Sequence, residues 1–293
     1  MRRLLLLIIL AVGAPLPAVA LEVAATTPNM AMLARSVGGE HVNVSVLAPG
    51  DRDVHYLEAR PSMMVALRRA DLLVAVGGEL ELGWLPAAVQ GAANPRLLPG
   101  RAGHFEAAAT VPLLDAGSPA DRSRGDVHPG GNPHIYLDPL RMAVAAEALA
   151  ERMAELDPAN AAAFRQNAGN FAARMERETA AWRERARGAP GALLFHKDAV
   201  YLMTRLEVPV HGYLEPLPGI PPTAGHIQQL VRELEGRKGV VFHMVYEPSR
   251  GPDRVGRELG WPVFRMHNNV PPEGVADDYV ALIESWVARL EER

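Results

Sequence analysis

Residues 191–214 read GALLFHKDAVYLMTRLEVPVHGYL. Two apolar runs in this stretch, GALLFH (191–196) and VPVHGYL (208–214), have the length and composition of buried strands. Between them, KDAVYLMTRL (197–206) has the length of a short helix. A strand, a helix and a second strand in this order predict two parallel strands joined by a crossover, which is the repeating unit of an α/β fold.

The sequence on both sides of this unit continues the alternation. After it we expect a helix, two strands and a closing helix over AGHIQQLVRELEG (224–236), GVVFHMVYE (239–247), WPVFRM (261–266) and DDYVALIESWVARLEE (277–292). Before it we expect strand, helix, strand, helix and strand over residues 21–27, 29–37, 41–49, 61–69 and 71–78. Each half of the chain therefore predicts a parallel sheet with helices on both faces.

A long polar stretch, residues 159–187, separates the two halves. Its large apolar residues are spaced seven, four and seven apart, which keeps them on one face of a helix: Phe164, Phe171, Met175 and Trp182. We therefore expect one long helix packed across both lobes. A rigid helical connection of this kind favours limited movement between the lobes over wide hinge opening.

The predicted fold class follows from these elements. It is α/β with two lobes, each a mainly parallel β-sheet flanked by helices, bridged by one long α-helix. The expected division is a first lobe at 21–158, the linking helix at 159–187 and a second lobe at 188–293.

Residues 1–20, MRRLLLLIILAVGAPLPAVA, have the plan of a secretory signal peptide. A basic start precedes a short apolar run, and small residues stand at Ala18 and Ala20. The sequence contains no cysteine, which excludes disulfides, zinc-thiolate sites and a lipid-modified cysteine. We therefore expect a soluble periplasmic protein with no lipid anchor, in which any metal site uses His, Asp, Glu or water.

The net charge of -4, with both signs mixed along the chain, gives no footprint for nucleic acid or for an anionic membrane surface. The sequence also lacks a phosphate loop, a nucleophile elbow and an HExxH helix. These absences weigh against nucleotide binding and against the commoner hydrolase mechanisms.

Three of the ten histidines follow predicted strands. His55 lies in the loop after the strand at 41–49, and His196 ends the strand at 191–196. His134 stands just before Asp138 and Pro139, which look like the cap and first turn of a helix at 139–155. Because ligands of open α/β sheets bind beyond the carboxyl ends of the strands, we expect these three side chains to share a site.

Five segments, in order and spacing, resemble the zinc/manganese class of ABC-transporter solute-binding proteins: PGDRDVHYLEARPS, ADLLVAVGGELELGWL, GNPHIYLDP, LLFHKDAVYL and YLEPLPGIPPTAGHI. The resemblance covers essentially the whole mature chain. It implies two metal-binding lobes with one metal ion between them. Its first three ligands fall on His55, His134 and His196.

The resemblance places a fourth ligand, an Asp in many members, in the loop after the last strand. Here that loop reads MHNNVPP and has no Asp. His267 is the chemically strongest substitute and completes the predicted metal site, while Asn268, Asn269 or a water are alternatives. Glu247 is a further candidate, although a structural acid near the lobe interface is the simpler interpretation. His128, in the Gly/Pro-rich loop at 117–131, is expected to be a solvated loop residue, with transient metal capture, which the resemblance implies for a His-bearing loop here, as the alternative.

Three histidines without a certain carboxylate favour Zn²⁺ over Mn²⁺, which prefers oxygen donors. The zinc is expected to be cargo and not a catalytic cofactor. The expected partner is an ABC-transporter permease in the inner membrane, with a periplasmic metallochaperone as a further candidate, and the protein is expected to be a monomer.

The alternative from another class is a secreted three-histidine zinc enzyme, a hydrolase or hydratase, because three histidines and a water on zinc also form a catalytic arrangement. Apart from Glu247, the sequence offers no clear general acid or base. We therefore predict a binding protein and not an enzyme. An adhesin on the same fold is a third interpretation.

Overall fold

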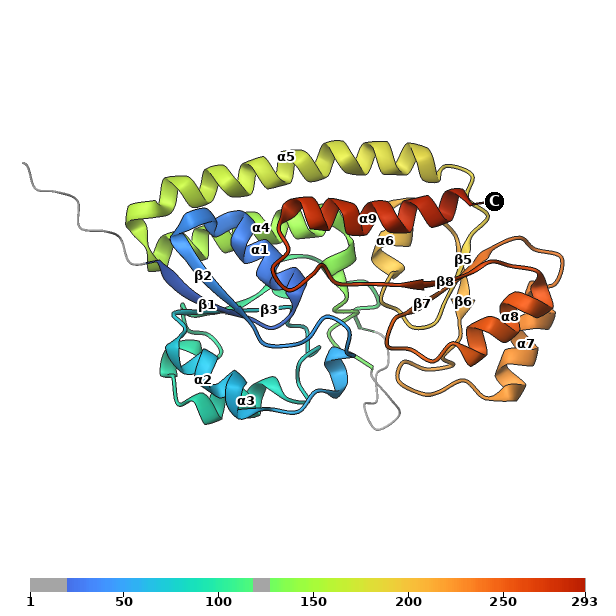
Figure 1. The fold of residues 1–293 in the computed structure, drawn as a ribbon, viewed down its shortest axis with the longest axis horizontal. Coiled ribbons are helices and arrows are strands. Elements are labelled where there is room, and N and C mark those ends of the chain that lie inside the picture. The colour runs from blue at the N-terminus through green and yellow to red at the C-terminus, as the bar shows by residue number, and fades with distance from the viewer. Residues whose placement is uncertain (1–19, 118–126, 293) are drawn as a thin grey trace, which may run out of the picture.

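The structure, a computed structural model, describes residues 20–117 and 127–292. The predicted signal peptide, apart from Ala20, and part of the loop at 117–131 lie outside the described residues. The chain forms two four-stranded sheets, each flanked by helices, and a long helix runs along both (Figure 1). The α/β fold class expected from the alternating elements is confirmed.

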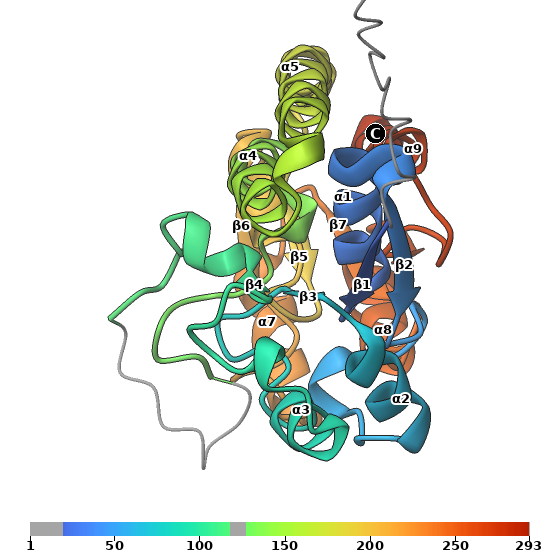
Figure 2. The same cartoon turned by 90° about the vertical axis from the view of Figure 1, so that its left-hand side faces the viewer.

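The first sheet has the strand order β2-β1-β3-β4 and is parallel throughout. Its strands are β1 (Leu21–Ala25), β2 (Val42–Val46), β3 (Leu72–Ala75) and β4 (His104–Glu106). Helix α1 (Pro28–Gly38) follows β1, and α2 (Pro61–Arg69) and α3 (Leu85–Ala92) cover the opposite face (Figure 2). Thr27 caps α1, because its side chain accepts a hydrogen bond from the backbone amide of Met30. Only two residues therefore separate the end of β1 from the start of α1.

The second sheet repeats this order as β6-β5-β7-β8, again parallel. Its strands are β5 (Ala192–Leu194), β6 (Val210–Tyr213), β7 (Val240–Met244) and β8 (Val263–Met266). The helices between and beside them are α6 (Val200–Arg205), α7 (Ala224–Leu234) and α8 (Arg250–Leu259). The two sheets therefore have the same topology. The sequence predicted this similarity, because strands and helices alternate in the same order in both halves of the chain.

One hydrophobic core joins the two lobes. It contains Val74 of the first sheet and Phe242 of the second, together with residues of α4 (Pro139–Leu156), α5 (Ala161–Ala186) and α9 (Ala276–Glu291). Two smaller cores lie on the outer faces of the sheets, one under α2 and α3 and one under α7 and α8. The shared core is why the lobes pack as one body around the ends of their strands.

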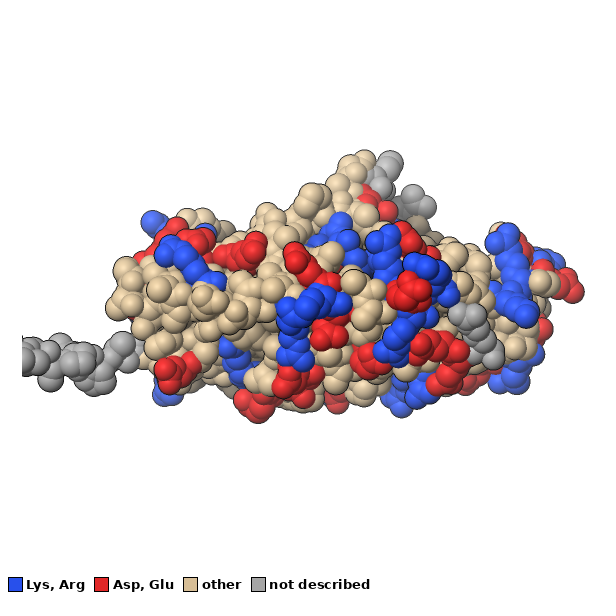
Figure 3. Space-filling view, turned by 90° about the horizontal axis from the view of Figure 1, so that it is seen from above, with Lys and Arg blue, Asp and Glu red and all other residues tan. Residues whose placement is uncertain are grey.

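Helix α5 runs along the top of both lobes beside α9 (Figure 1). Phe164, Phe171, Met175 and Trp182 are all buried, as their spacing predicted. Ion pairs from Arg174 to Asp277 and from Arg185 to Glu284 join α5 to α9 across their exposed sides. Seen from this side, positive and negative side chains alternate over the surface with no large patch of one sign (Figure 3). We propose the division 21–158, 159–187 and 188–293 on the basis of the two sheets and this helix.

Three elements have no counterpart in the sequence prediction: α3, β4 and α8. Strand β4 is only three residues long, and the first turn of α8 contains Gly251 and Pro252. Both features remove the periodic signal on which the prediction relied. Among the described residues, no helix is both long enough and apolar enough to cross a membrane.

Candidate metal centre

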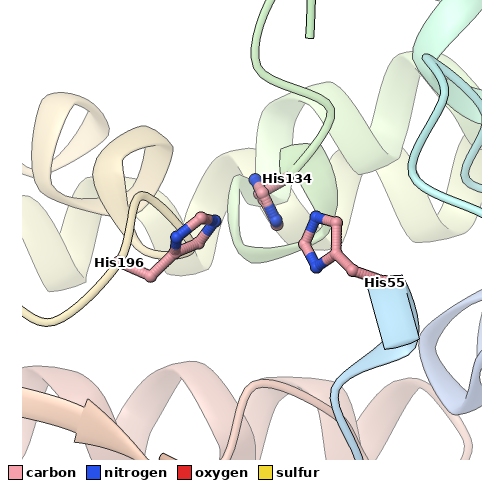
Figure 4. Close-up of side chains that lie close together, drawn as sticks. All are labelled: His55, His134 and His196. Carbon is pink, nitrogen blue, oxygen red and sulfur yellow. The ribbon is translucent and has the colours of Figure 1, made fainter. Parts of the chain in front are cut away.

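Three segments from both lobes bring His55, His134 and His196 together (Figure 4). His55 lies in a single 3₁₀ turn, Val54–Tyr56, after β2. His134 precedes a second 3₁₀ turn that leads into α4, and His196 lies two residues beyond β5. One ring nitrogen from each histidine lies within 4.8 Å of the other two. The three side chains converge as expected, but only His55 and His196 follow strands, whereas His134 lies in the segment that leads into α4.

Each of the three rings is held through its Nδ1 atom by an acceptor. Asp53 Oδ1 lies 2.7 Å from Nδ1 of His55, and Asn132 Oδ1 lies 2.6 Å from Nδ1 of His134. Glu215 Oε2 lies 2.7 Å from Nδ1 of His196. A ring that donates from Nδ1 presents the lone pair of Nε2, so these contacts select the tautomer that a metal ion needs.

Two of these acceptors belong to the same local motif. Asp53 and Asn132 each stand two residues before their histidine and accept its backbone amide as well as its ring N–H. This is the short turn that Asp and Asn side chains form with the backbone two residues on. An Asp or Asn two residues before a histidine is therefore the sequence signal that would have identified both orienting residues.

The opposite nitrogens of these rings are buried without a protein partner. Within the described residues, Nε2 of His55, His134 and His196 forms no hydrogen bond. The side chains are only 8%, 2% and 9% exposed. A buried polar atom without a partner costs about 1 to 3 kcal/mol, and three of them face one point here. A cation at that point would satisfy all three.

The electrostatics of the cluster differ from ring to ring. Burial, followed by the charges of His196 and His55, holds the pKa of His134 well below its ordinary value. Burial also works to lower the pKa of His196, but the hydrogen bond with Glu215 and the charge of Asp198 outweigh it and raise that pKa to about 9. Before metal binds, a proton at the cluster therefore resides on His196.

A pocket of about 230 Å³ opens beside the three histidines. His55 and His196 line it together with two buried carboxylates, Asp198 and Glu247. The His128 ring also lies close, with its centre 5.5 Å from that of His55 and 6.1 Å from that of His134. The expectation that His128 is a solvated loop residue does not match this position beside the cluster.

His267 is not part of the cluster. Its side chain is exposed and lines a separate pocket with Pro49 and Asn269. At the end of β8, Met266 and Asn268 point inward and His267 points outward, because successive side chains of an extended chain alternate between faces. The buried Asn268 is the residue of this loop that reaches toward the site.

Two acidic residues named in the sequence analysis have structural contacts. Asp138 caps α4, as the sequence predicted, and also pairs with Arg141 and Arg205. Glu247 accepts the backbone amide of Met244 just beyond β7. Burial and the charge of Asp198 raise the pKa of Glu247 well above its ordinary value.

Comparison with known proteins gives a family and a fold. The sequence profile of the family described as "Zinc-uptake complex component A periplasmic" matches residues 23–293. The crystal structure of ZnuA superposes with a TM-score of 0.74 at 22% identity, covering 92% of this chain and 98% of that one.

The chain is also similar in sequence to several curated proteins. The iron-binding protein YfeA of Yersinia pestis is 23% identical over 268 residues, covering 87% of this chain and 80% of its own length. The metal ABC transporter substrate-binding lipoprotein ScbA of Streptococcus cristatus is 22% identical over 174 residues, 58% of this chain. The chain spans about half of ScbA, 53% of its length. The resemblance inferred from the five segments is confirmed: this chain belongs to the zinc-uptake component A family, which comprises substrate-binding proteins of metal ABC transporters.

Proposed function

We propose that this chain captures Zn²⁺ in the periplasm and delivers it to the permease of an ABC transporter. His55, His134 and His196 act as ligands in this proposal. The observation that carries it is the set of three buried Nε2 atoms without hydrogen-bond partners, each fixed by an acceptor on the other ring nitrogen.

Zinc suits this donor set best. Neutral imidazoles in a tetrahedral arrangement bind Zn²⁺ at about 2.0 to 2.1 Å, which places neighbouring donors roughly 3.3 Å apart. The nitrogens here lie within 4.8 Å of one another, so each pair has to approach by at most about 1.5 Å when the ion binds. Iron is the metal named for the relative YfeA, so Fe²⁺ and Mn²⁺ are the competitors to test.

The location and partner are part of the same proposal. The family description names the periplasm, and substrate-binding proteins of ABC transporters work with a membrane permease and its ATPase. The relative ScbA is named a lipoprotein, whereas free diffusion of this chain is a prediction from its lack of cysteine.

The first experiment is metal analysis of protein isolated from the periplasm of its host, with zinc, iron and manganese measured together. We expect about one zinc per chain in the parent and none in His134→Ala. In a host that lacks the gene, the parent and not His134→Ala should restore growth in zinc-depleted medium. Zinc-dependent hydrolysis or hydration by the purified protein, without such rescue, would favour the enzyme alternative.

A further inference from the structure

The carboxylate of Asp198, a residue that the sequence analysis placed in a short helix at 197–206, lies at the edge of the histidine cluster. Asp198 follows His196 by two residues, and its side chain is 3% exposed. Its Oδ1 atom lies 3.9 Å from Nε2 of His134. It also lines the pocket that His55 and His196 share, so it borders the cluster from the side of that pocket.

Asp198 is held by neutral donors from three separate segments. Tyr136 donates its hydroxyl to Oδ1 at 3.2 Å, Tyr246 does so at 3.3 Å, and Asn268 donates its side-chain amide at 3.2 Å. Asn268 is itself fixed, because its backbone oxygen accepts the side-chain amide of Asn29. The donors come from both lobes, so the carboxylate sits where the lobes meet.

The charge of this carboxylate has no fixed counterion nearby. Among the described residues, no Lys or Arg forms an ion pair with Asp198, and the only charge of opposite sign that the metal-free cluster offers it is the exchangeable proton on His196. A buried carboxylate without a paired charge is costly, and hydroxyl and amide donors offset only part of that cost. A divalent cation at the histidine cluster would provide the missing charge.

The other acidic residues of the pocket already have different roles. Asp53 and Glu215 each accept from a ligand histidine, and Glu247 accepts the amide of Met244. Building on the function proposed above, we propose that Asp198 is the fourth ligand of the bound cation. Asn268, in the loop where the resemblance expects an Asp, then acts as a positioning residue that holds Asp198.

The distance from Asp198 to one of the three rings is already close to that of a zinc site. Neighbouring donors on a tetrahedral zinc ion lie roughly 3.3 Å apart, and Oδ1 of Asp198 already lies 3.9 Å from the His134 donor. A site of three imidazoles and one carboxylate carries a net charge of +1 when filled with Zn²⁺. A site with water in the fourth position carries +2 and stays open to small anions.

The test compares Asp198→Asn with the control variant Glu247→Gln, which makes the same acid-to-amide change at another acidic residue of the same pocket. Zinc affinity is measured by competition with a chromophoric chelator. We expect Asp198→Asn to lose at least about 100-fold, because even a residue that only supports a ligand is worth about 10- to 100-fold. Glu247→Gln should bind like the parent. Parent-like affinity of Asp198→Asn would overturn the assignment.

A second measurement separates a ligand from a supporting residue and does not depend on the stability of a variant. Co²⁺ replaces Zn²⁺ in the parent, and its visible absorption is recorded with and without azide. If Asp198 fills the fourth position, azide should leave the parent spectrum unchanged and shift that of Asp198→Asn. An azide-sensitive parent would overturn the proposal. Failure of His134→Ala to lose zinc would instead reject the three-histidine site itself.

Discussion

Oε2 of Glu215 lies 2.7 Å from Nδ1 of His196, and both side chains are almost fully buried. The pair joins β5 to the loop after β6, so one lobe supplies both the ring and its orienting acid. This contact gives His196 an electrostatic character different from that of His134, whose Nδ1 faces the neutral amide oxygen of Asn132. The site thus combines one imidazole that holds a proton strongly with one that resists protonation.

Metal binding should therefore release a proton near neutral pH. The pKa of His196 is raised to about 9, so this ring is protonated at pH 7.5 and must lose its proton to bind Zn²⁺. Affinity should rise with pH up to about 9, instead of levelling off above the unperturbed value of about 6.5. Calorimetry in buffers of different ionisation enthalpy should give about one proton released per zinc at pH 7.5.

The matched variant for this prediction is Glu215→Gln. It keeps an acceptor for the ring N–H but removes the charge, so the pKa of His196 should fall and fewer protons should be released. Equal binding heats in all buffers for the parent protein would show that His196 is already neutral and would contradict the argument.

His267→Ala should bind zinc with parent-like affinity. The His267 side chain is exposed and lines a different pocket, so its removal takes nothing from the cluster. His196→Ala should lose at least about 100-fold under the same conditions, because it removes a donor atom itself. Competition titrations of the two variants side by side decide the point, and a clear loss in His267→Ala would restore it as a ligand.

The fold could be predicted from sequence where an element has a periodic pattern. Helix α2 begins and ends at the predicted residues, and the apolar stripe of α5 is buried as its spacing required. Strand β4 could not be predicted because three residues are too few to show an alternating hydrophobic pattern. Helix α8 could not be predicted because Gly and Pro interrupt the helical pattern near its start.

The part of the site that could be predicted is the part whose residues directly follow a strand or precede a helix. His55 and His196 meet because the strands before them, one in each sheet, end where the two lobes face each other, and the segment before α4 adds His134. Asp198 was missed because KDAVYL fits the start of a helix, and nothing local shows that this side chain points away from α6 toward the cluster. His267 was favoured on chemistry alone, while the inward or outward direction of its side chain depends on where β8 ends.

Asn132→Ala should weaken zinc binding by about 10- to 100-fold with little loss of fold. Asn132 accepts both the ring N–H and the backbone amide of His134, so without it the ring rotates freely and presents Nε2 less often. Asn269→Ala is the control, because Asn269 donates to Asn268 and contacts none of the three rings. Parent-like affinity in Asn132→Ala would mean that packing alone orients His134.

Asp138→Ala should destabilise the fold by about 3 kcal/mol or more, with the metal site otherwise intact. Asp138 is fully buried, caps α4 and pairs with both Arg141 and Arg205, so its removal leaves two guanidinium groups without their carboxylate. Urea unfolding of the metal-free protein measures the change. Glu151→Ala, which removes an exposed pair with Arg165, should have no measurable effect. Similar midpoints for both variants would contradict the structural role of Asp138.

Zinc binding should leave the overall dimensions of the protein nearly unchanged. The shared core runs from Val74 through α4, α5 and α9 to Phe242, and a hinge movement of the lobes would have to break it. The required approach of the three donors is at most about 1.5 Å, which loop and side-chain adjustment at His55 and His196 can supply. Small-angle X-ray scattering of metal-free and zinc-loaded protein should therefore give superimposable curves, while amide exchange slows in the loops that carry the ligands. A clear decrease in the radius of gyration on adding zinc would show that the lobes close as separate bodies, and the core across α5 would then have to be weaker than its burial indicates.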